Sequence, residues 1–174
     1  MIGYEIGMSG QSLVISGEVL HHFSSYRQLR WWHREAGGQL FARFEGNQVL
    51  VTHATGPRQT DRRARRFYHP DRMAEQREVD VFHQAGHHFI GTWHTHPEDR
   101  PTPSAIDIDS ISEAFRLSKH ALNGFVLAIV GRSQLPAGLY VGISDGAVLH
   151  QLKSSGRSPS HHSALVVLSE DLVS

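Results

Sequence analysis

The sequence predicts an α/β domain in which helices flank a mixed β-sheet. Strand-like and helix-like segments alternate from residue 13 to residue 130. The continuous apolar run at 125–130 has the pattern of a central strand that is buried on both faces. Two further strand-like segments flank Asp145-Gly146, which is a strong hairpin signal. Alternating elements favour parallel strands and the hairpin requires antiparallel ones, so we expect a mixed sheet.

In the first half of the chain, three segments have the pattern of strands: residues 13–15, 38–44 and 48–54. The last two are separated by the turn-forming residues 45–47, Glu-Gly-Asn, which suit a hairpin. Ser16 is placed to cap a helix whose inward face carries Val19 and Phe23. The sequence therefore predicts a strand, a helix and then a hairpin.

The second half begins with an irregular stretch, residues 56–70. Asp71 is placed to cap a second helix that ends near Gly86. Residues 89–96 then read as a strand, and a Pro-rich loop leads into a third helix at 104–119. The closing hairpin is expected to pair two segments: residues 139–143 and 147–152.

Length and composition predict one ordinary domain. The chain has 174 residues, of which 39% are hydrophobic and 20% charged, so it can bury a core and remain soluble. We expect the folded domain to span residues 1–152. Residues 153–163 are rich in Ser, Gly and His and read as a linker, and a short apolar tail follows at 164–168.

Several classes of protein are excluded or disfavoured. The chain has no cysteine, which excludes disulfide frameworks, thiolate zinc sites and cysteine nucleophiles. Seventeen basic residues balance seventeen acidic ones, so the global charge does not argue for a nucleic-acid or membrane partner. The first residues lack the basic and apolar pattern of a signal peptide, and no apolar run is long enough for a spanning helix. We therefore expect a cytoplasmic protein.

One stretch carries a pattern with chemical meaning. His94 and His96 stand two apart at the end of an expected strand, which puts both imidazoles on the same face. Ser104 is placed to cap the third helix, and Asp107 follows one turn later. Asp107 shares its face with apolar Ile111, so it is expected to point inward. A buried carboxylate needs a partner, and a cation held jointly with the two histidines would supply one.

Two histidines and one aspartate are a suitable ligand set for catalytic zinc. Three protein ligands leave a fourth tetrahedral position for water, whose pKa the metal lowers to about 7. A carboxylate must then receive the proton. Glu35 is the candidate, because it precedes Ala36-Gly37-Gly38 at the start of the first long strand. The alternative is that the histidines are ordinary strand residues and Ser104 only a cap, which leaves the inward Asp107 unexplained.

This pattern resembles the JAMM motif of the JAB/MPN metalloprotease family. The match covers an upstream glutamate, a His-x-His-Pro sequence, a serine and an aspartate: Glu35, His94, His96, Pro97, Ser104 and Asp107. The resemblance implies the JAB/MPN sandwich, which is cytidine-deaminase-like, over about residues 13–152. It further implies that His94, His96 and Asp107 bind Zn²⁺. By the same resemblance Glu35 is the general base and proton shuttle, and Ser104 stabilises the oxyanion.

The compact length and the Trp-His-Thr-His-Pro context at 93–97 look most like small stand-alone bacterial members. Some of these sit in antiphage-defence operons, including CBASS, beside an E1/E2-like ligase. The resemblance implies a protein substrate: a conjugate of a ubiquitin-like modifier or of a CBASS nucleotidyltransferase, cleaved at its C-terminal tail. Two alternatives stay open, namely C-terminal trimming of a sulfur-carrier-like protein and a non-catalytic MPN-like binding module.

Other features have competing interpretations. Six arginines and two aspartates lie between Gly56 and Arg72. This stretch is either a solvated loop or a docking surface, for an acidic partner or for the extended C-terminal tail of a modifier. We do not expect nucleic acid there, because the rest of the chain compensates the charge. Trp31 and Trp32 are expected to pack in the core or at its rim, and the alternative is that they form a wall of a substrate groove. Three His-His pairs are expected at the surface or in local hydrogen bonds: those at 21–22, 87–88 and 161–162.

Overall fold

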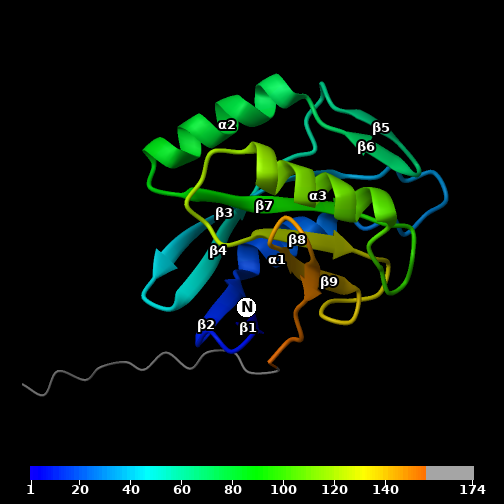
Figure 1. Ribbon diagram of the computed structural model, residues 1–174. Helices are drawn as coiled ribbons and strands as arrows, with labels where there is room; N and C mark the ends of the chain where they lie inside the picture. The colour runs from blue at the N-terminus through cyan, green and yellow to red at the C-terminus, as the bar shows by residue number, and fades with distance from the viewer. Residues whose placement is uncertain (156–174) are drawn as a thin grey trace, which may run out of the picture.

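The computed structural model describes residues 1–155 and places three helices around one large sheet (Figure 1). That sheet has eight strands in the order β1-β2-β4-β3-β7-β8-β9-β10. The strands of the sheet are β1 (Ile2–Ile6), β2 (Gln11–Ile15), β3 (Gly37–Glu45), β4 (Gln48–Ala54), β7 (His88–Thr95), β8 (Phe125–Val130), β9 (Leu139–Ser144) and β10 (Leu149–Gln151). A separate two-stranded sheet consists of β5 (Arg62–Ala64) and β6 (Phe67–His69). The helices are α1 (Gly17–Ser25), α2 (Arg72–Gln84) and α3 (Ala105–Leu117).

The large sheet is mixed, which confirms the predicted fold class. Strand β2 pairs parallel with β4, and β7 pairs parallel with β8. The remaining neighbours are antiparallel: β1 with β2, β3 with β4 and β7, β8 with β9, and β9 with β10. Parallel neighbours cannot be joined by a tight turn, so α3 crosses over between the ends of β7 and β8.

Strand β8 divides two hydrophobic cores. Alternate side chains of a strand point to opposite faces, and all six residues of β8 are buried. Val126, Ala128 and Val130 pack in the core that contains Phe23 of α1. Leu127 and its alternate neighbours face the other core, which contains Ile111 of α3. The sheet therefore lies between two layers of helix.

Helices α2 and α3 share one face of the sheet, and α1 covers the other. Phe82 of α2 stacks on Phe41 of β3 with ring centroids 4.2 Å apart. Figure 1 shows α2 and α3 together on the upper side of the sheet, with α1 beneath it. On the α1 face, Phe23 packs against Trp93 of β7 at 5.1 Å between centroids. Because Trp93 faces α1, its neighbours His94 and Thr92 face α3.

Three segments differ from the sequence-based expectation. Strand β1 was not predicted, because the glycine in Ile-Gly-Tyr-Glu-Ile weakens its pattern; it gains its stability from pairing with β2 and from burial of Tyr4. Residues 56–70 are not wholly irregular, since they contain the β5–β6 hairpin. Strands of three residues are too short for periodicity to reveal. The closing strand is also shorter than expected, Leu149–Gln151.

The His87-His88 pair is only partly at the surface. His87 is buried rather than at the surface, and it has the hydrogen-bonded setting that was the other expectation. Arg43 donates to its Nε2 at 3.2 Å, and its Nδ1 lies 2.9 Å from the hydroxyl of Thr52. Burial lowers the pKa of His87, and the charges of His53 and Arg43 act in the same direction. The pair at 161–162 lies outside the described residues.

The end of the described chain packs against β1. Ser154 forms a bridge with Tyr4, and the backbone N–H of Ser155 donates to the carbonyl of Gly3 at 2.9 Å. The apolar tail predicted at 164–168 and most of the predicted linker fall outside the described residues. Within residues 1–155, no helix has both the length and the apolar character needed to cross a bilayer.

Gly38 provides a test of the packing beside β3. A Cβ at Gly38 would lie 1.9 Å from the carbonyl oxygen of Thr55, and the indole of Trp93 fixes that oxygen by donating to it at 2.9 Å. We expect Gly38→Ala to lower the free energy of unfolding by about 3 kcal/mol, measured by urea denaturation. Gly17→Ala is the control, since nothing lies within 4 Å of that position. Equal stability of the two variants would contradict the packing described.

Candidate metal centre and active site

His94 and His96 are brought together by the end of β7. Their Nε2 atoms lie 3.1 Å apart, and each side chain is largely shielded from solvent. The backbone is fixed on both sides, because β7 pairs with β3 and β8 and the N–H of His96 donates to the carbonyl of Val130 at 2.9 Å. The two-residue spacing therefore places both imidazoles on the same face, as predicted, and the structure shows that α3 covers this face.

Asp107 reaches the histidines from the first turn of α3. Ser104 is the N-cap, and the two residues form a capping box. The Ser104 backbone N–H and hydroxyl donate to Oδ2 of Asp107 at 2.7 and 2.8 Å. The same carboxylate lies 3.1 Å from Nε2 of His94 and 3.4 Å from Nε2 of His96. Capping thus fixes the carboxylate directly over the two imidazoles.

The electrostatics of this cluster favour an ionised carboxylate. Burial alone would raise the pKa of Asp107, but hydrogen bonds with His94 and His96 outweigh burial and hold it well below the usual range. Burial likewise opposes the charged form of His96, yet Asp107 and Glu35 together raise the pKa of that imidazole. The cluster is therefore a set of groups that stabilises positive charge at its centre.

The cluster fits a tetrahedral metal ion. One ligand atom from each of His94, His96 and Asp107 lies within 4.8 Å of the other two. Zinc with bonds of about 2.0–2.1 Å separates its tetrahedral ligand atoms by about 3.3 Å. The two Nε2 atoms lie 3.1 Å apart, and each lies at a similar distance from one oxygen of the Asp107 carboxylate: 3.1 Å from His94 to Oδ1 and 3.4 Å from His96 to Oδ2. Two imidazoles and a carboxylate are also a donor set that zinc accepts, with one position left open.

Glu35 is buried at the entrance of β3 and belongs to the same cleft. Burial raises the pKa of its carboxyl to about 7; the charge of Asp107 adds to this effect and that of His96 opposes it. The backbone of Glu35 is held by the small hairpin: its N–H donates to the carbonyl of Ala64 at 2.8 Å, and Nε of Arg63 donates to its carbonyl at 2.6 Å. A carboxyl with this pKa can both accept and return a proton near neutral pH.

A buried glutamine, Gln28, links the segment that leads into Glu35 to strand β7, at the end of which His94 and His96 lie. Gln28 is 2% exposed, and its amide nitrogen donates to the carbonyls of His33 and Arg65 at 3.2 and 2.9 Å. Its amide oxygen accepts from the hydroxyl of Thr95 at 3.1 Å, and Thr95 accepts from the N–H of Ala36 at 3.0 Å. Thr95 lies between the two histidines in sequence, so this network sets Glu35 relative to them.

The Arg-rich stretch is partly a structural element rather than a solvated loop. The Arg58 side chain is 11% exposed and pairs with Glu78, Glu75 and Asp61. Tyr68 donates to Asp61 at 2.9 Å, which ties β6 to the same group. These contacts join the β5–β6 hairpin to α2. Arg58 therefore supports the hairpin that holds Glu35.

The hairpin, α3 and the end of β7 enclose a cleft of about 340 Å³. Close packing of β6 on β3 depends on Gly37, where a Cβ would lie 2.6 Å from the ring of Tyr68. The cleft is lined by the expected site residues and by residues of the hairpin, α2 and α3. Its lining includes Glu35, Arg66, Phe67, Tyr68, His69, His94, His96, Ser104, Ile106 and Asp107. It is large enough for an extended peptide segment.

The structure brings together all five residues selected from the sequence: Glu35, His94, His96, Ser104 and Asp107. Sequence reasoning missed Gln28 and Thr95, whose contacts span 37 and 67 residues of chain and follow no short motif. It also assigned the two tryptophans wrongly. Trp31 and Trp32 are 72% and 55% exposed and belong neither to the core nor to the cleft.

The fold and the site match one protein family. A histidine pair and an aspartate beside a buried glutamate, on an α/β/α sandwich, define a candidate metal-dependent hydrolase site. The family model described as "Prokaryotic homologs of the JAB domain" matches residues 19–139, a range that contains Glu35 and the motif from His94 to Asp107. The chain therefore belongs to this JAB family, which confirms the family predicted from the motif.

Three relatives carry the name CD-NTase/cGAS isopeptidase. The relative from Escherichia coli strain TW11681 is 36% identical over 126 residues, which cover 71% of this chain and 78% of the relative. A relative from Vibrio cholerae is 36% identical over 127 residues and covers 69% and 76% of the two chains. A third, from Pseudomonas aeruginosa, is 34% identical over 143 residues and covers 78% and 87%.

Two solved structures share the fold. Protein DSY2949 from Desulfitobacterium hafniense superposes with a TM-score of 0.57 at 17% identity, over 80% of this chain and 88% of that one. A protein from Salinibacter ruber gives a TM-score of 0.51 at 19% identity, over 84% and 93%. At this level of identity the likeness concerns architecture alone.

The buried carboxyl of Glu35 predicts a pH-dependent stability. Its folded pKa of about 7 exceeds the ordinary value of 4.5, so its stabilising contribution is complete below pH 4.5 and lost as the pH rises through 7. At pH 8, burying the charge costs up to about 3 kcal/mol. With chelator present, Glu35→Gln should therefore be more stable than wild type at pH 8 and no more stable at pH 4.5, by urea denaturation.

The control is Glu45→Gln, at the exposed far end of the same strand. It should leave the stability unchanged at both pH values. A Glu35→Gln effect of the same size at pH 4.5 and pH 8 would contradict the burial of a titrating carboxyl.

Proposed function

We propose that this protein is a zinc-dependent isopeptidase that releases a CD-NTase, or a ubiquitin-like modifier, from a lysine side chain to which its C-terminus is joined. The observation that carries the proposal is the shared cleft, which places the carboxyl of Glu35 beside the His94, His96 and Asp107 cluster. The names of the three relatives support the isopeptidase activity and the CD-NTase substrate. A role in antiphage defence follows if that substrate is the CBASS enzyme.

His94, His96 and Asp107 would hold the zinc ion. When bound, zinc supplies Lewis acidity, which polarises a scissile carbonyl and lowers the pKa of water. The hydrogen bonds from Ser104 to Asp107 keep the carboxylate aimed at the histidines. The pairing of β7 with β3 and β8 keeps the two imidazoles from moving apart.

Glu35 would move the proton. Its carboxylate takes a proton from the attacking water and delivers it to the leaving lysine amine. The burial that raises its pKa to about 7 balances these two tasks, because a more acidic carboxyl would return the proton less readily. Arg63 and Ala64 hold the backbone of Glu35, so its reach into the cleft is set by the β5–β6 hairpin.

Ser104 would stabilise the oxyanion of the tetrahedral intermediate. Its hydroxyl lines the cleft and donates to Asp107 at 2.8 Å. Rotation of that O–H would redirect its donor toward a carbonyl oxygen in the cleft, while the backbone N–H of Ser104 continues to hold the carboxylate. A preorganised donor of this kind acts on charge that develops only in the transition state.

The C-terminal tail of the substrate would lie extended along β6. Phe67, Tyr68 and His69 line the cleft on that side, and Ile106 lines it on the side of α3. Among the described residues β6 pairs only with β5, so its other edge offers backbone groups to a peptide. A tail held in this way would present its last carbonyl to the metal cluster.

The test uses a CD-NTase from one of the three organisms above, joined through its C-terminus to a lysine of a reporter protein. The zinc-loaded chain should release two intact proteins, identified by mass spectrometry. Glu35→Gln should retain one zinc but lose turnover by at least 100-fold, because it removes the proton acceptor and no ligand. Undiminished turnover in this variant would contradict the role of Glu35. A shortened free CD-NTase would indicate trimming instead.

Metal content tests the ligand set separately. His96→Ala and Asp107→Ala should each lose zinc by elemental analysis after dialysis, because two remaining ligands bind it much more weakly. His69→Ala is the matched control, since it removes an exposed histidine that lines the same cleft outside the cluster. A full zinc complement in either ligand variant would remove that residue from the proposed set.

A further inference from the structure

An aromatic pair stands exposed beside the active site. Trp31 and Trp32 are 72% and 55% exposed, and neighbouring Leu29 is 55% exposed. The two indoles leave on the order of 250 Å² of apolar surface open to solvent. Large exposed apolar groups that cluster on a monomer commonly mark a contact surface. The segment that carries them leads directly into Glu35.

The backbone beneath the pair is held in place. Nη1 of Arg65 donates to the carbonyl of Trp31 at 2.8 Å, and buried Gln28 donates to the carbonyl of His33 at 3.2 Å. The N–H of His33 donates to the carbonyl of Arg30 at 3.1 Å. The tryptophans are therefore presented on a fixed segment, which lowers the entropy cost of binding through them.

The surroundings of the pair are strongly basic. The segments 27–34 and 62–66 contain seven arginines and no aspartate or glutamate, and Gln28 and Arg65 join them in space. In residues 1–155 none of these seven arginines forms an ion pair, whereas Arg58 and Arg72 nearby do. Within the described residues, the positive charge of these seven guanidinium groups is therefore not balanced by an ion pair, and an acidic partner would balance it.

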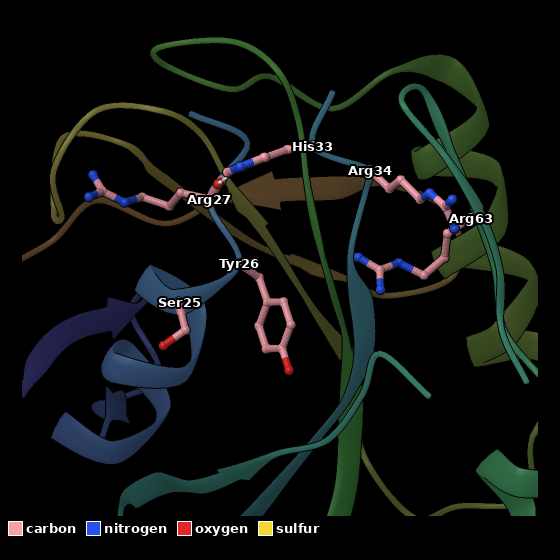
Figure 2. Close-up of a pocket in the computed structure, with 6 residues that line it drawn as sticks. All are labelled: Ser25, Tyr26, Arg27, His33, Arg34 and Arg63. Atoms are coloured by element: carbon pink, nitrogen blue, oxygen red, sulfur yellow. Dashed lines mark hydrogen bonds between the residues drawn. The ribbon is translucent and has the colours of Figure 1, made fainter. Parts of the chain in front are cut away.

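A small cavity continues this surface (Figure 2). It measures about 220 Å³ and is lined by Ser25, Tyr26, Arg27, His33, Arg34 and Arg63. In Figure 2 the side chain of Arg63 extends toward the ring of Tyr26, while that of Arg27 points away. Burial lowers the pKa of Arg63, and this effect outweighs the opposing influence of Tyr26 and Tyr68; the nearby charge of Arg34 acts in the same direction as burial. A carboxylate in this cavity would neutralise both guanidinium groups.

The geometry of the pair favours a protein partner over a nucleic acid. The two indoles meet edge to face, at 89° and 5.5 Å between centroids. The guanidinium of Arg30 covers a face of Trp32 at 5.3 Å from the ring centroid. A platform for nucleobases needs open ring faces, whereas an edge-to-face pair suits insertion into an apolar patch of a folded protein.

We propose that Trp31, Trp32 and the surrounding arginines form a second contact surface, which binds an acidic patch with an apolar centre on the folded body of the substrate protein. This inference rests on the proposed function, because the proposed function assigns the C-terminal tail of that substrate to the cleft. Arg66 lines the cleft and the preceding Arg65 contacts the backbone of Trp31, so the turn between β5 and β6 borders both surfaces. Once the folded body is bound to the second surface, binding of the tail in the cleft would become effectively intramolecular.

The test compares two substrates of the zinc-loaded chain: the CD-NTase conjugate described above, and a short peptide of its C-terminal tail joined to lysine. We expect the double variant Trp31→Ala/Trp32→Ala, and Arg30→Glu, to raise KM for the conjugate at least tenfold. Both should change kcat for the short peptide less than twofold. Phe44→Ala and Arg77→Glu, at exposed positions outside the two basic segments, are matched controls that should leave both parameters unchanged.

Binding supplies a readout that does not depend on turnover. In a Glu35→Gln background, the tryptophan and Arg30 changes should weaken the Kd for the conjugate at least tenfold. An unchanged Kd would overturn the second surface even if cleavage occurs, whereas binding without any cleavage by the parent chain would count against the proposed function alone. Salt-dependent binding of a labelled dT20 oligonucleotide that is lost in the variants, with an unchanged KM for the conjugate, would also overturn it.

Discussion

The carboxylate of Asp107 is the point on which the candidate site depends, because it meets both histidines and the start of α3. Strands β7 and β8 are parallel neighbours, so the chain must cross over between them, and it does so through α3. Such a crossover places the N-terminus of the helix near the carboxyl end of the first strand. The spacing between His96 and Asp107 therefore suits the fold, because the crossover brings the first turn of α3 next to the end of β7.

Glu35 depends on a different constraint. No residue of the motif holds it; the β5–β6 hairpin does, through Arg63 and Ala64. The hairpin in turn depends on the ion pairs of Arg58 with α2. The metal cluster therefore belongs to the central sheet and α3, while the proton acceptor stands between the central sheet, through the contacts of Ala36 with Thr95, and the appended hairpin.

The sequence was sufficient to predict what depends on local pattern. The apolar run of β8, the face shared by His94 and His96, and the cap that orients Asp107 all follow from periodicity or one helical turn. The β5–β6 hairpin could not be predicted, since its three-residue strands rely on contacts with α2. The roles of Gln28 and His87 were also hidden, because their partners lie more than 30 residues away in the chain.

The most direct test of this account is anomalous diffraction at the zinc edge from a crystal of the full chain soaked in zinc. We predict one strong peak within bonding distance of Nε2 of His94, Nε2 of His96 and the carboxylate of Asp107, with the carboxyl of Glu35 facing the open position. Peaks confined to other histidines, with these three side chains turned apart, would contradict it.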